Sequence, residues 1–84
     1  MTTVKAALVQ CAWTGNKDSM IERHAKYIAD AAKQGAQVMC LQELFYGPYF
    51  CQVEDKKGYA YTEKIPDGPT TKLMQKLAAK HKMA

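Results

Sequence analysis

The sequence predicts an α/β fold in which two strands and two helices alternate along the chain. Residues 4–11 and 36–41 are almost continuously apolar, which is typical of parallel strands that are covered on both faces. Between them, apolar side chains recur every three or four residues and so mark one face of a helix. A second helical pattern follows Pro69. The strand, helix, strand order predicts a right-handed crossover and therefore two parallel strands.

The helix between the strands is predicted to begin at Asp18 or Ser19 and to end before Gly35. Either side chain can cap the helix by accepting a hydrogen bond from a backbone N–H group, and Glu22 stands where a capping box after Ser19 requires it. Gly35 suits a left-handed C-terminal cap, because glycine has no Cβ atom to clash there. The buried face is predicted to consist of Met20, Ile21, Ala25, Ile28, Ala29 and Ala32.

The segment from residue 44 to residue 67 is predicted to be a long loop. It is rich in glycine and proline, which interrupt regular structure, and it holds six of the eight aromatic side chains. Loops of this length inside compact domains are usually functional or disordered. The aromatic residues are Phe45, Tyr46, Tyr49, Phe50, Tyr59 and Tyr61.

A turn over residues 67–69 introduces the second predicted helix. Pro69 suits its first position, because a proline lacks the N–H group that would be unpaired there. Lys72, Lys76 and Lys80 recur at four-residue steps, and a solvated helix face is favoured over a phosphate-binding stripe for them. The buried face is predicted to consist of Leu73, Met74, Leu77 and Ala78.

The composition is that of a soluble globular protein. Of the 84 residues, 48% are hydrophobic and 24% are charged, which excludes a disordered chain. No apolar run reaches the roughly 18 to 20 residues that a membrane-spanning helix needs. The net charge of +4 arises entirely from four lysines, Lys72, Lys76, Lys80 and Lys82, because basic and acidic residues balance before them. We therefore expect neither a nucleic acid nor a membrane as partner.

The three cysteines are predicted to be reduced thiols. Cys11, Cys40 and Cys51 form no CxxC pair and show no zinc-site spacing, so neither a disulfide nor a metal site is expected. Residues 1–10 lack the basic and apolar regions of a secretory signal, and the expected location is cytoplasmic. The sequence has no glycine-rich phosphate-binding motif, and we expect no cofactor.

The cysteines and histidines are weak candidates for catalysis. Cys11 and Cys40 are explained as small apolar side chains of the predicted strands. Cys51 has no evident partner that would activate its thiol. His24 and His81 are predicted to lie at exposed or boundary positions on the two helices.

The pattern indicates an incomplete domain. Two strands that read as buried need helices on both faces of the sheet and further strands beside them. Residues 81–84 end the sequence without a cap signal such as glycine, as though cut short before another strand. We therefore expect residues 1–84 to form part of a single domain. A tight oligomer that covers the exposed faces is the competing explanation.

Glu43 is the residue most able to carry chemistry. It directly follows the apolar VMCLQ and precedes FYGPYF, so it lies at the carboxyl end of the second predicted strand. Open α/β sheets bind their ligands at that edge. A carboxylate that is partly removed from water there can accept a proton from a thiol or a water molecule. From position alone, a structural salt bridge or a loop cap is the favoured role.

Two segments, GAQVMCLQELFYGPYFCQ and IPDGPTTKLMQKLAAKH, resemble the carbon-nitrogen hydrolases of the nitrilase superfamily. Within it, they are most similar to the branch of β-ureidopropionase and N-carbamoylputrescine amidase. The resemblance covers essentially the whole chain and implies a four-layer α-β-β-α sandwich, of which this chain would form the N-terminal βαβα portion. It also implies a catalytic set of Glu, Lys and Cys. Glu43 matches the glutamate that acts as general base.

The resemblance further implies a small-molecule substrate, an N-carbamoyl amine or a related amide, with no metal or organic cofactor and a homo-oligomeric parent. The family's lysine and cysteine lie beyond residue 84, so this chain alone is expected to be inactive. Tyr49 or Phe50 could wall the substrate pocket, although core packing is the favoured role for each. A different class of function is a noncatalytic βαβ module that oligomerises or binds a partner through its aromatic loop.

Overall fold

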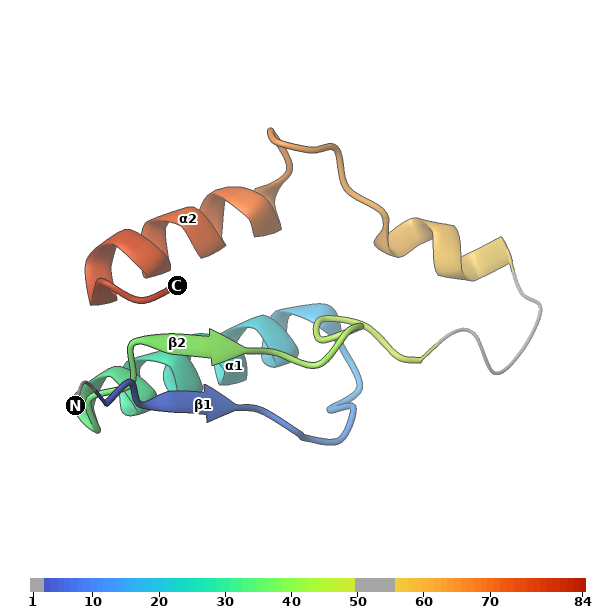
Figure 1. Cartoon of the computed structure of the whole chain (residues 1–84). Coiled ribbons are helices and arrows are strands. Elements are labelled where there is room, and N and C mark those ends of the chain that lie inside the picture. The colour runs from blue at the N-terminus through green and yellow to red at the C-terminus, as the bar shows by residue number, and fades with distance from the viewer. Residues whose placement is uncertain (1–2, 50–55) are drawn as a thin grey trace.

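The structure is a computed structural model that describes residues 3–49 and 56–84. It is a mixed α/β structure, and the predicted order of strand, helix, strand and helix is confirmed (Figure 1). Within the described part of the predicted loop, residues 56–61 form a 3-10 helix. In chain order, the elements are β1 (Ala6–Leu8), α1 (Lys17–Lys33), β2 (Val38–Cys40), the 3-10 helix (Lys56–Tyr61) and α2 (Pro69–His81).

The two strands are parallel, as the crossover predicts. Ala7 lies opposite Met39 at the centre of the pair. Beyond the strands, the backbone N–H of Val9 donates to the carbonyl oxygen of Cys40 at 3.1 Å. Each strand spans three residues, so both are shorter than the predicted 4–11 and 36–41. An apolar run reports burial, whereas the length of a strand also depends on how long its neighbour stays within hydrogen-bonding distance.

Helix α1 begins one residue before Asp18, and its cap differs from the prediction. Oδ1 of Asn16 accepts a hydrogen bond from the backbone N–H of Ser19 at 2.8 Å, so Asn16 caps the helix. The assignment of the cap to Asp18 or Ser19 was wrong, because both residues lie within the first turn. Gly35 has a φ of +88° just after the helix, which confirms the predicted left-handed end.

Both helices pack against the same face of the sheet. The buried apolar centre consists of Ile28 from α1, Ala36 and Met83. Ala7 and Met39, the middle residues of the strands, pack against this centre. Met74 and Leu77 bring α2 to it.

The opposite face of the sheet is exposed in the described part of the chain. Neighbouring residues of a strand point to opposite faces. The residues on either side of Ala7 and Met39 are accordingly exposed, and Leu8 reaches 85% exposure. The expected cover on both faces is therefore absent among residues 3–49 and 56–84.

The chain returns to the sheet after α2. Lys82 adopts a left-handed conformation with a φ of 51° and ends the helix, although the sequence shows no cap there. The backbone N–H of Ala84 donates to the carbonyl oxygen of Gln37 at 3.0 Å, and that of Met39 donates to Ala84 at 2.8 Å. The carbonyl oxygen of Cys40 accepts its hydrogen bond from the β1 side of β2. Neighbouring residues of a strand direct their backbone hydrogen bonds to opposite sides, so Met39 bonds away from β1. Its partner Ala84 therefore lies at the other edge of β2 (Figure 1).

Candidate functional site

The predicted site residue Glu43 lies just beyond the carboxyl end of β2, as expected. The neighbouring Gln42 connects this end to β1, because its Oε1 atom accepts a hydrogen bond from the backbone N–H of Cys11 at 2.9 Å. The two segments that leave the sheet are therefore held side by side. This places Glu43 at the edge where parallel sheets bind ligands.

Two hollows meet at Glu43. One has a volume of about 270 Å³ and is formed mainly by the chain from Glu43 to Pro48 together with Tyr61. The other has a volume of about 360 Å³, and its lining includes Cys11, Trp13, Glu43 and Tyr49. Glu43 thus borders both hollows, and a small molecule could occupy either of them.

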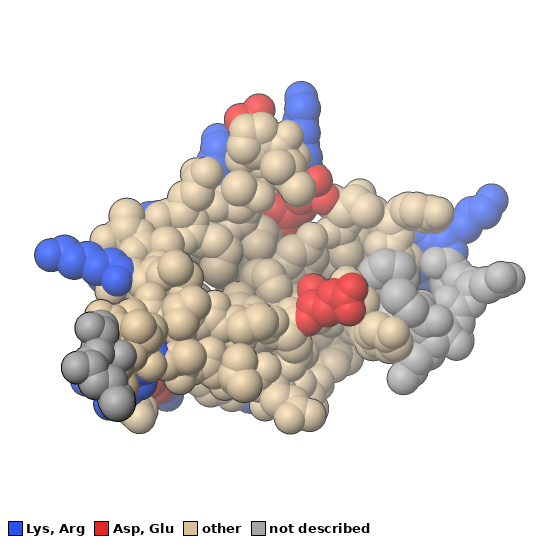
Figure 2. Space-filling model, viewed as in Figure 1, with Lys and Arg blue, Asp and Glu red and all other residues tan. Residues whose placement is uncertain are grey.

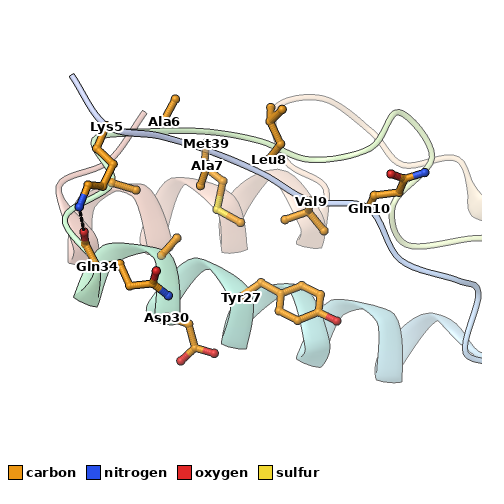
Figure 3. A pocket seen from close by; sticks show the side chains of 12 residues that line it. Lys5, Ala6, Ala7, Leu8, Val9, Gln10, Tyr27, Asp30, Gln34 and Met39 are labelled. Atoms are coloured by element: carbon orange, nitrogen blue, oxygen red, sulfur yellow. Dashed lines mark hydrogen bonds between the residues drawn. The ribbon is translucent and has the colours of Figure 1, made fainter. Parts of the chain in front are cut away.

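A larger hollow of about 490 Å³ lies away from Glu43, between β1 and α1. Figure 3 shows Tyr27 and Asp30 projecting from α1 beside it, while Lys5 reaches across its end. The Nζ atom of Lys5 donates a 2.7 Å hydrogen bond to the carbonyl oxygen of Gln34. The nucleophilic, basic and acidic residues singled out from the sequence do not line this hollow, so its size alone does not make it the candidate site.

The side chain of Glu43 is exposed to solvent, as far as the described residues are concerned. The partial burial expected from its position is not found there, because the helices cover the sheet face and not this end of it. Among the described residues, no hydrogen bond or ion pair engages its carboxylate. The structural salt bridge or loop cap that position alone favours is therefore not formed within residues 3–49 and 56–84.

A second acidic residue, Glu63, accepts several hydrogen bonds and forms a connected polar cluster. Its Oε2 atom accepts hydrogen bonds from Nζ of Lys17 and from the hydroxyl of Thr70, each at 2.5 Å. Its Oε1 atom accepts one from the backbone N–H of Thr70 at 2.7 Å, at the start of α2. Burial by itself would raise the pKa of Glu63, but these hydrogen bonds and the charge of Lys17 lower it from 4.5 to about 2. This carboxylate is held in its charged form.

Sequence reasoning missed Glu63, because it lies outside the usual capping position of α2. The N-cap residue of that helix is Gly68, which has no side chain that could accept a hydrogen bond. The carboxylate of Glu63, five residues earlier in the sequence, accepts the hydrogen bond from the backbone N–H of Thr70 instead. A Cβ atom on Gly68 would lie 2.5 Å from the carbonyl oxygen of Lys64. Glycine is therefore required for this close approach, and the glycine before Pro69 is the signal that could have revealed it.

Several aromatic side chains pack against one another and against the start of α1, namely those of Trp13, Phe45, Tyr46 and Tyr61. Nζ of Lys17 lies 4.6 Å from the ring centre of Tyr46, whose hydroxyl donates to the carbonyl oxygen of Tyr61. Trp13 meets Tyr61 edge to face, with ring centres 6.3 Å apart. Phe45 meets Tyr46 in the same way at 5.3 Å. These contacts fix the segment that begins at Glu43.

The predicted pocket walls are only partly described. Tyr49 is 58% exposed and lines the hollow of about 360 Å³ beside Glu43. A core-packing role for Tyr49 is therefore wrong for this part of the chain. Phe50 and Cys51 lie outside the described residues.

His24 is fully buried, so its predicted exposed or boundary position was wrong. Met20, His24 and Ile28 follow one another at four-residue steps along α1 and form its buried stripe. Nδ1 of His24 lies 2.8 Å from the carbonyl oxygen of Met20, and Nε2 lies 3.9 Å from Sγ of Cys11. The four-residue spacing from Met20 is the sequence signal that could have placed His24 inside.

The charged residues do not gather into a binding patch in the view of Figure 2, where lysine and arginine side chains stand apart at the rim. Lys72, Lys76 and Lys80 are exposed on α2, as the solvated-face interpretation requires. No group of three or more Cys, His, Asp or Glu in the described ranges could hold a metal ion. No helix in those ranges is long and apolar enough to cross a membrane.

The carbon-nitrogen hydrolase family model matches residues 5–84. The chain belongs to this family. The match confirms the resemblance carried by the segments on either side of the aromatic loop and covers all of the described elements. No solved structure gives a significant match.

This carbon-nitrogen hydrolase chain is also similar to curated relatives, among them amidases and a citrullinase. It is 35% identical over 75 residues to the N-carbamoylputrescine amidase of Oryza sativa subsp. japonica, which covers 89% of the chain and 25% of that protein. It is 31% identical over 81 residues to a citrullinase of Francisella tularensis subsp. tularensis. That alignment covers 96% of this chain and 28% of the citrullinase. It is 35% identical over 75 residues to the human omega-amidase NIT2. That alignment covers 89% of this chain and 26% of the omega-amidase. The chain spans about a quarter of the length of these relatives.

Proposed function

We propose that Glu43 is the general base of a hydrolase that cleaves carbon-nitrogen bonds of N-carbamoyl amines or related amides. The main support is the place of Glu43, which lies beyond β2 and borders two hollows. Its carboxylate has no partner among the described residues. Membership in the carbon-nitrogen hydrolase family supplies the reaction class. A carboxylate without a permanent partner is free to accept a proton from a neighbouring nucleophile.

In the proposed mechanism, Glu43 accepts the proton of a cysteine thiol supplied by sequence beyond residue 84. The thiolate attacks the carbonyl or carbamoyl carbon, and a lysine, also from beyond residue 84, stabilises the oxyanion. The amine leaves, and water then hydrolyses the thioester-like intermediate. Because two of its three catalytic groups would be absent, the 84-residue chain alone is predicted to have no activity.

The substrate class rests on the relatives. The name N-carbamoylputrescine amidase states an N-carbamoyl amine, and the name omega-amidase states an amide. A small uncharged carbonyl group fits the space beside Glu43, because a negatively charged one would be repelled by the carboxylate. The amine portion would lie toward the aromatic side chains of the adjoining hollows.

The same proposal accounts for the exposed face of the sheet. Val4, Leu8 and Val38 are exposed there, and burying them would be favourable by the hydrophobic effect. A second sheet on this face would give the four-layer α-β-β-α sandwich, with residues 1–84 as the first part of one domain. We place this domain in a cytoplasmic homo-oligomer. The alternative of a noncatalytic binding module is not favoured, since the matched family is a family of hydrolases.

The test is Glu43→Gln in the full-length enzyme, with N-carbamoyl amine hydrolysis followed by release of the free amine. Glutamine keeps the shape of the side chain but cannot accept the thiol proton, so kcat is expected to fall by about 10³-fold. Glu22→Gln is the matched control, because Glu22 is an exposed carboxylate on α1. It should leave kcat unchanged. A near-normal kcat in Glu43→Gln with a native circular dichroism spectrum would remove Glu43 from the mechanism.

A further inference from the structure

Cys11 and His24 form a pair that the proposed hydrolysis does not use. Sγ of Cys11 lies 3.9 Å from Nε2 of His24, within the range of a hydrogen bond to sulfur. The backbone of Cys11 is fixed by the 2.9 Å bond to Gln42, and the imidazole is fully buried. Both residues are therefore held by contacts of their own.

The hydrogen bond at the other ring nitrogen sets the proton position on His24. Nδ1 lies 2.8 Å from the carbonyl oxygen of Met20, and a carbonyl oxygen can only accept. Nδ1 therefore carries the proton in the neutral ring, and Nε2 presents its lone pair toward Cys11. Phe45 and Tyr27 pack edge-on against the ring, with ring centres 5.1 and 5.8 Å away, and hold it in this orientation.

Cys11 borders open space as well as the imidazole. Cys11 is only partly buried, and it lines the hollow of about 360 Å³ that also contains Glu43. A thiol that has a base within hydrogen-bonding distance and borders open space has the arrangement of an activated nucleophile. The nearby carboxylate disfavours anions, so the reagent that suits this space is small and uncharged.

We propose that Cys11 is a site of oxidation by hydrogen peroxide, with His24 as the proton acceptor. The thiol proton passes to Nε2 of His24, and the sulfur attacks one peroxide oxygen. The S–O bond forms as the O–O bond breaks, and the departing hydroxide takes the proton from His24 to leave as water. The sulfur is oxidised to a sulfenic acid and the peroxide is reduced to water. This inference goes beyond the proposed hydrolysis and does not depend on it.

Cys40 provides an internal standard in the same chain. Its side chain is exposed, and its Sγ atom faces the carbonyl oxygen of Leu41 at 3.5 Å rather than an imidazole. Exposure alone would make Cys40 the more reactive thiol. If the pair with His24 controls reactivity, Cys11 should react faster in spite of being less exposed.

The experiment treats the 84-residue chain with hydrogen peroxide in the presence of dimedone, which traps sulfenic acids, and assigns the adducts by peptide mass spectrometry. Cys11 is expected to be labelled at least about tenfold faster than Cys40 in the native protein. In guanidinium chloride, the ratio of the two rates should fall to about one, because the pair with His24 is lost with the fold. Equal rates in the native protein, or slower labelling of Cys11, would overturn the proposal.

His24→Asn tests the base directly. Asparagine keeps an N–H donor near the Met20 carbonyl oxygen but has no atom in place of Nε2. The labelling of Cys11 should then slow to the rate of Cys40, while Cys40 itself is unchanged. His81→Asn on α2 is the matched control and should leave both rates as they are. An unchanged ratio in His24→Asn would show that the imidazole does not act on the thiol.

Discussion

Nζ of Lys17 donates a 2.5 Å hydrogen bond to Oε2 of Glu63, although 46 positions separate the two residues in the sequence. Lys17 is the first residue of α1, whereas Glu63 precedes α2 and also receives two hydrogen bonds from Thr70 in its first turn. A single carboxylate therefore holds together the starts of both helices. The aromatic segment that follows Glu43 packs on the same lysine, through Tyr46.

Glu63→Gln should destabilise the protein by about 2 kcal/mol. The Glu63 side chain is 11% exposed, so its charge is largely shielded from water and depends on its partners. Glutamine preserves one acceptor oxygen for the N–H of Thr70 but leaves the charge of Lys17 without its counterion. The free energy of unfolding is measured by urea titration.

The control for this substitution is Glu22→Gln, which removes an exposed carboxylate from α1. It should change the free energy of unfolding by no more than about 0.5 kcal/mol, as is usual for surface positions. If both variants lose the same small amount, the contact between Lys17 and Glu63 contributes little in solution.

The same carboxylate predicts a loss of stability in acid. The pKa of Glu63 is about 2 in the folded protein, against 4.5 when no partners are present. The carboxylate of Glu63 therefore binds a proton more tightly in the unfolded chain than in the folded protein, so its protonation favours unfolding. The contribution of Glu63 is complete above about pH 4.5 and is lost as the pH falls toward 2, and it amounts to about 3 kcal/mol at most.

This pH dependence can be measured by comparing the wild type with Glu63→Gln. The difference between their free energies of unfolding should stay constant from neutral pH to about pH 5 and shrink below that. A difference that persists unchanged to the lowest accessible pH would mean that the two proteins differ for reasons other than the charge of Glu63.

The sequence was sufficient for the features that depend on local patterns. The apolar runs and the helical periodicity between them predicted two parallel strands and a crossover helix, and Pro69 marked the first residue of α2. The position of Glu43 after β2 followed from the same pattern. The elements themselves are determined by residues that are close together in the chain, and the parallel pairing follows from their order.

Features that depend on distant partners could not be predicted in this way. The contact between Lys17 and Glu63 requires the aromatic segment to fold back onto α1, which no local pattern encodes. The pairing of His24 with Cys11 requires the turn after β1 to pass over the buried face of α1. The expected partial burial of Glu43 failed for a related reason, since burial at the end of a strand depends on layers that the described residues do not supply.

The cap of α1 shows how neighbouring signals compete within a few residues, and it gives a last prediction. Three good capping residues, Asn16, Asp18 and Ser19, lie at or near the start of the helix. The structure selects Asn16, whose Oδ1 atom accepts a hydrogen bond from the N–H of Ser19. Asn16→Ala should therefore lower the free energy of unfolding by about 1 kcal/mol, because it leaves that N–H without a partner. Asn16→Asp should retain the stability, since an aspartate caps equally well and also favours the positive end of the helix. Thermal unfolding followed by circular dichroism measures both variants. If Asn16→Asp lowers the free energy of unfolding as much as Asn16→Ala does, the side chain at this position does not cap α1.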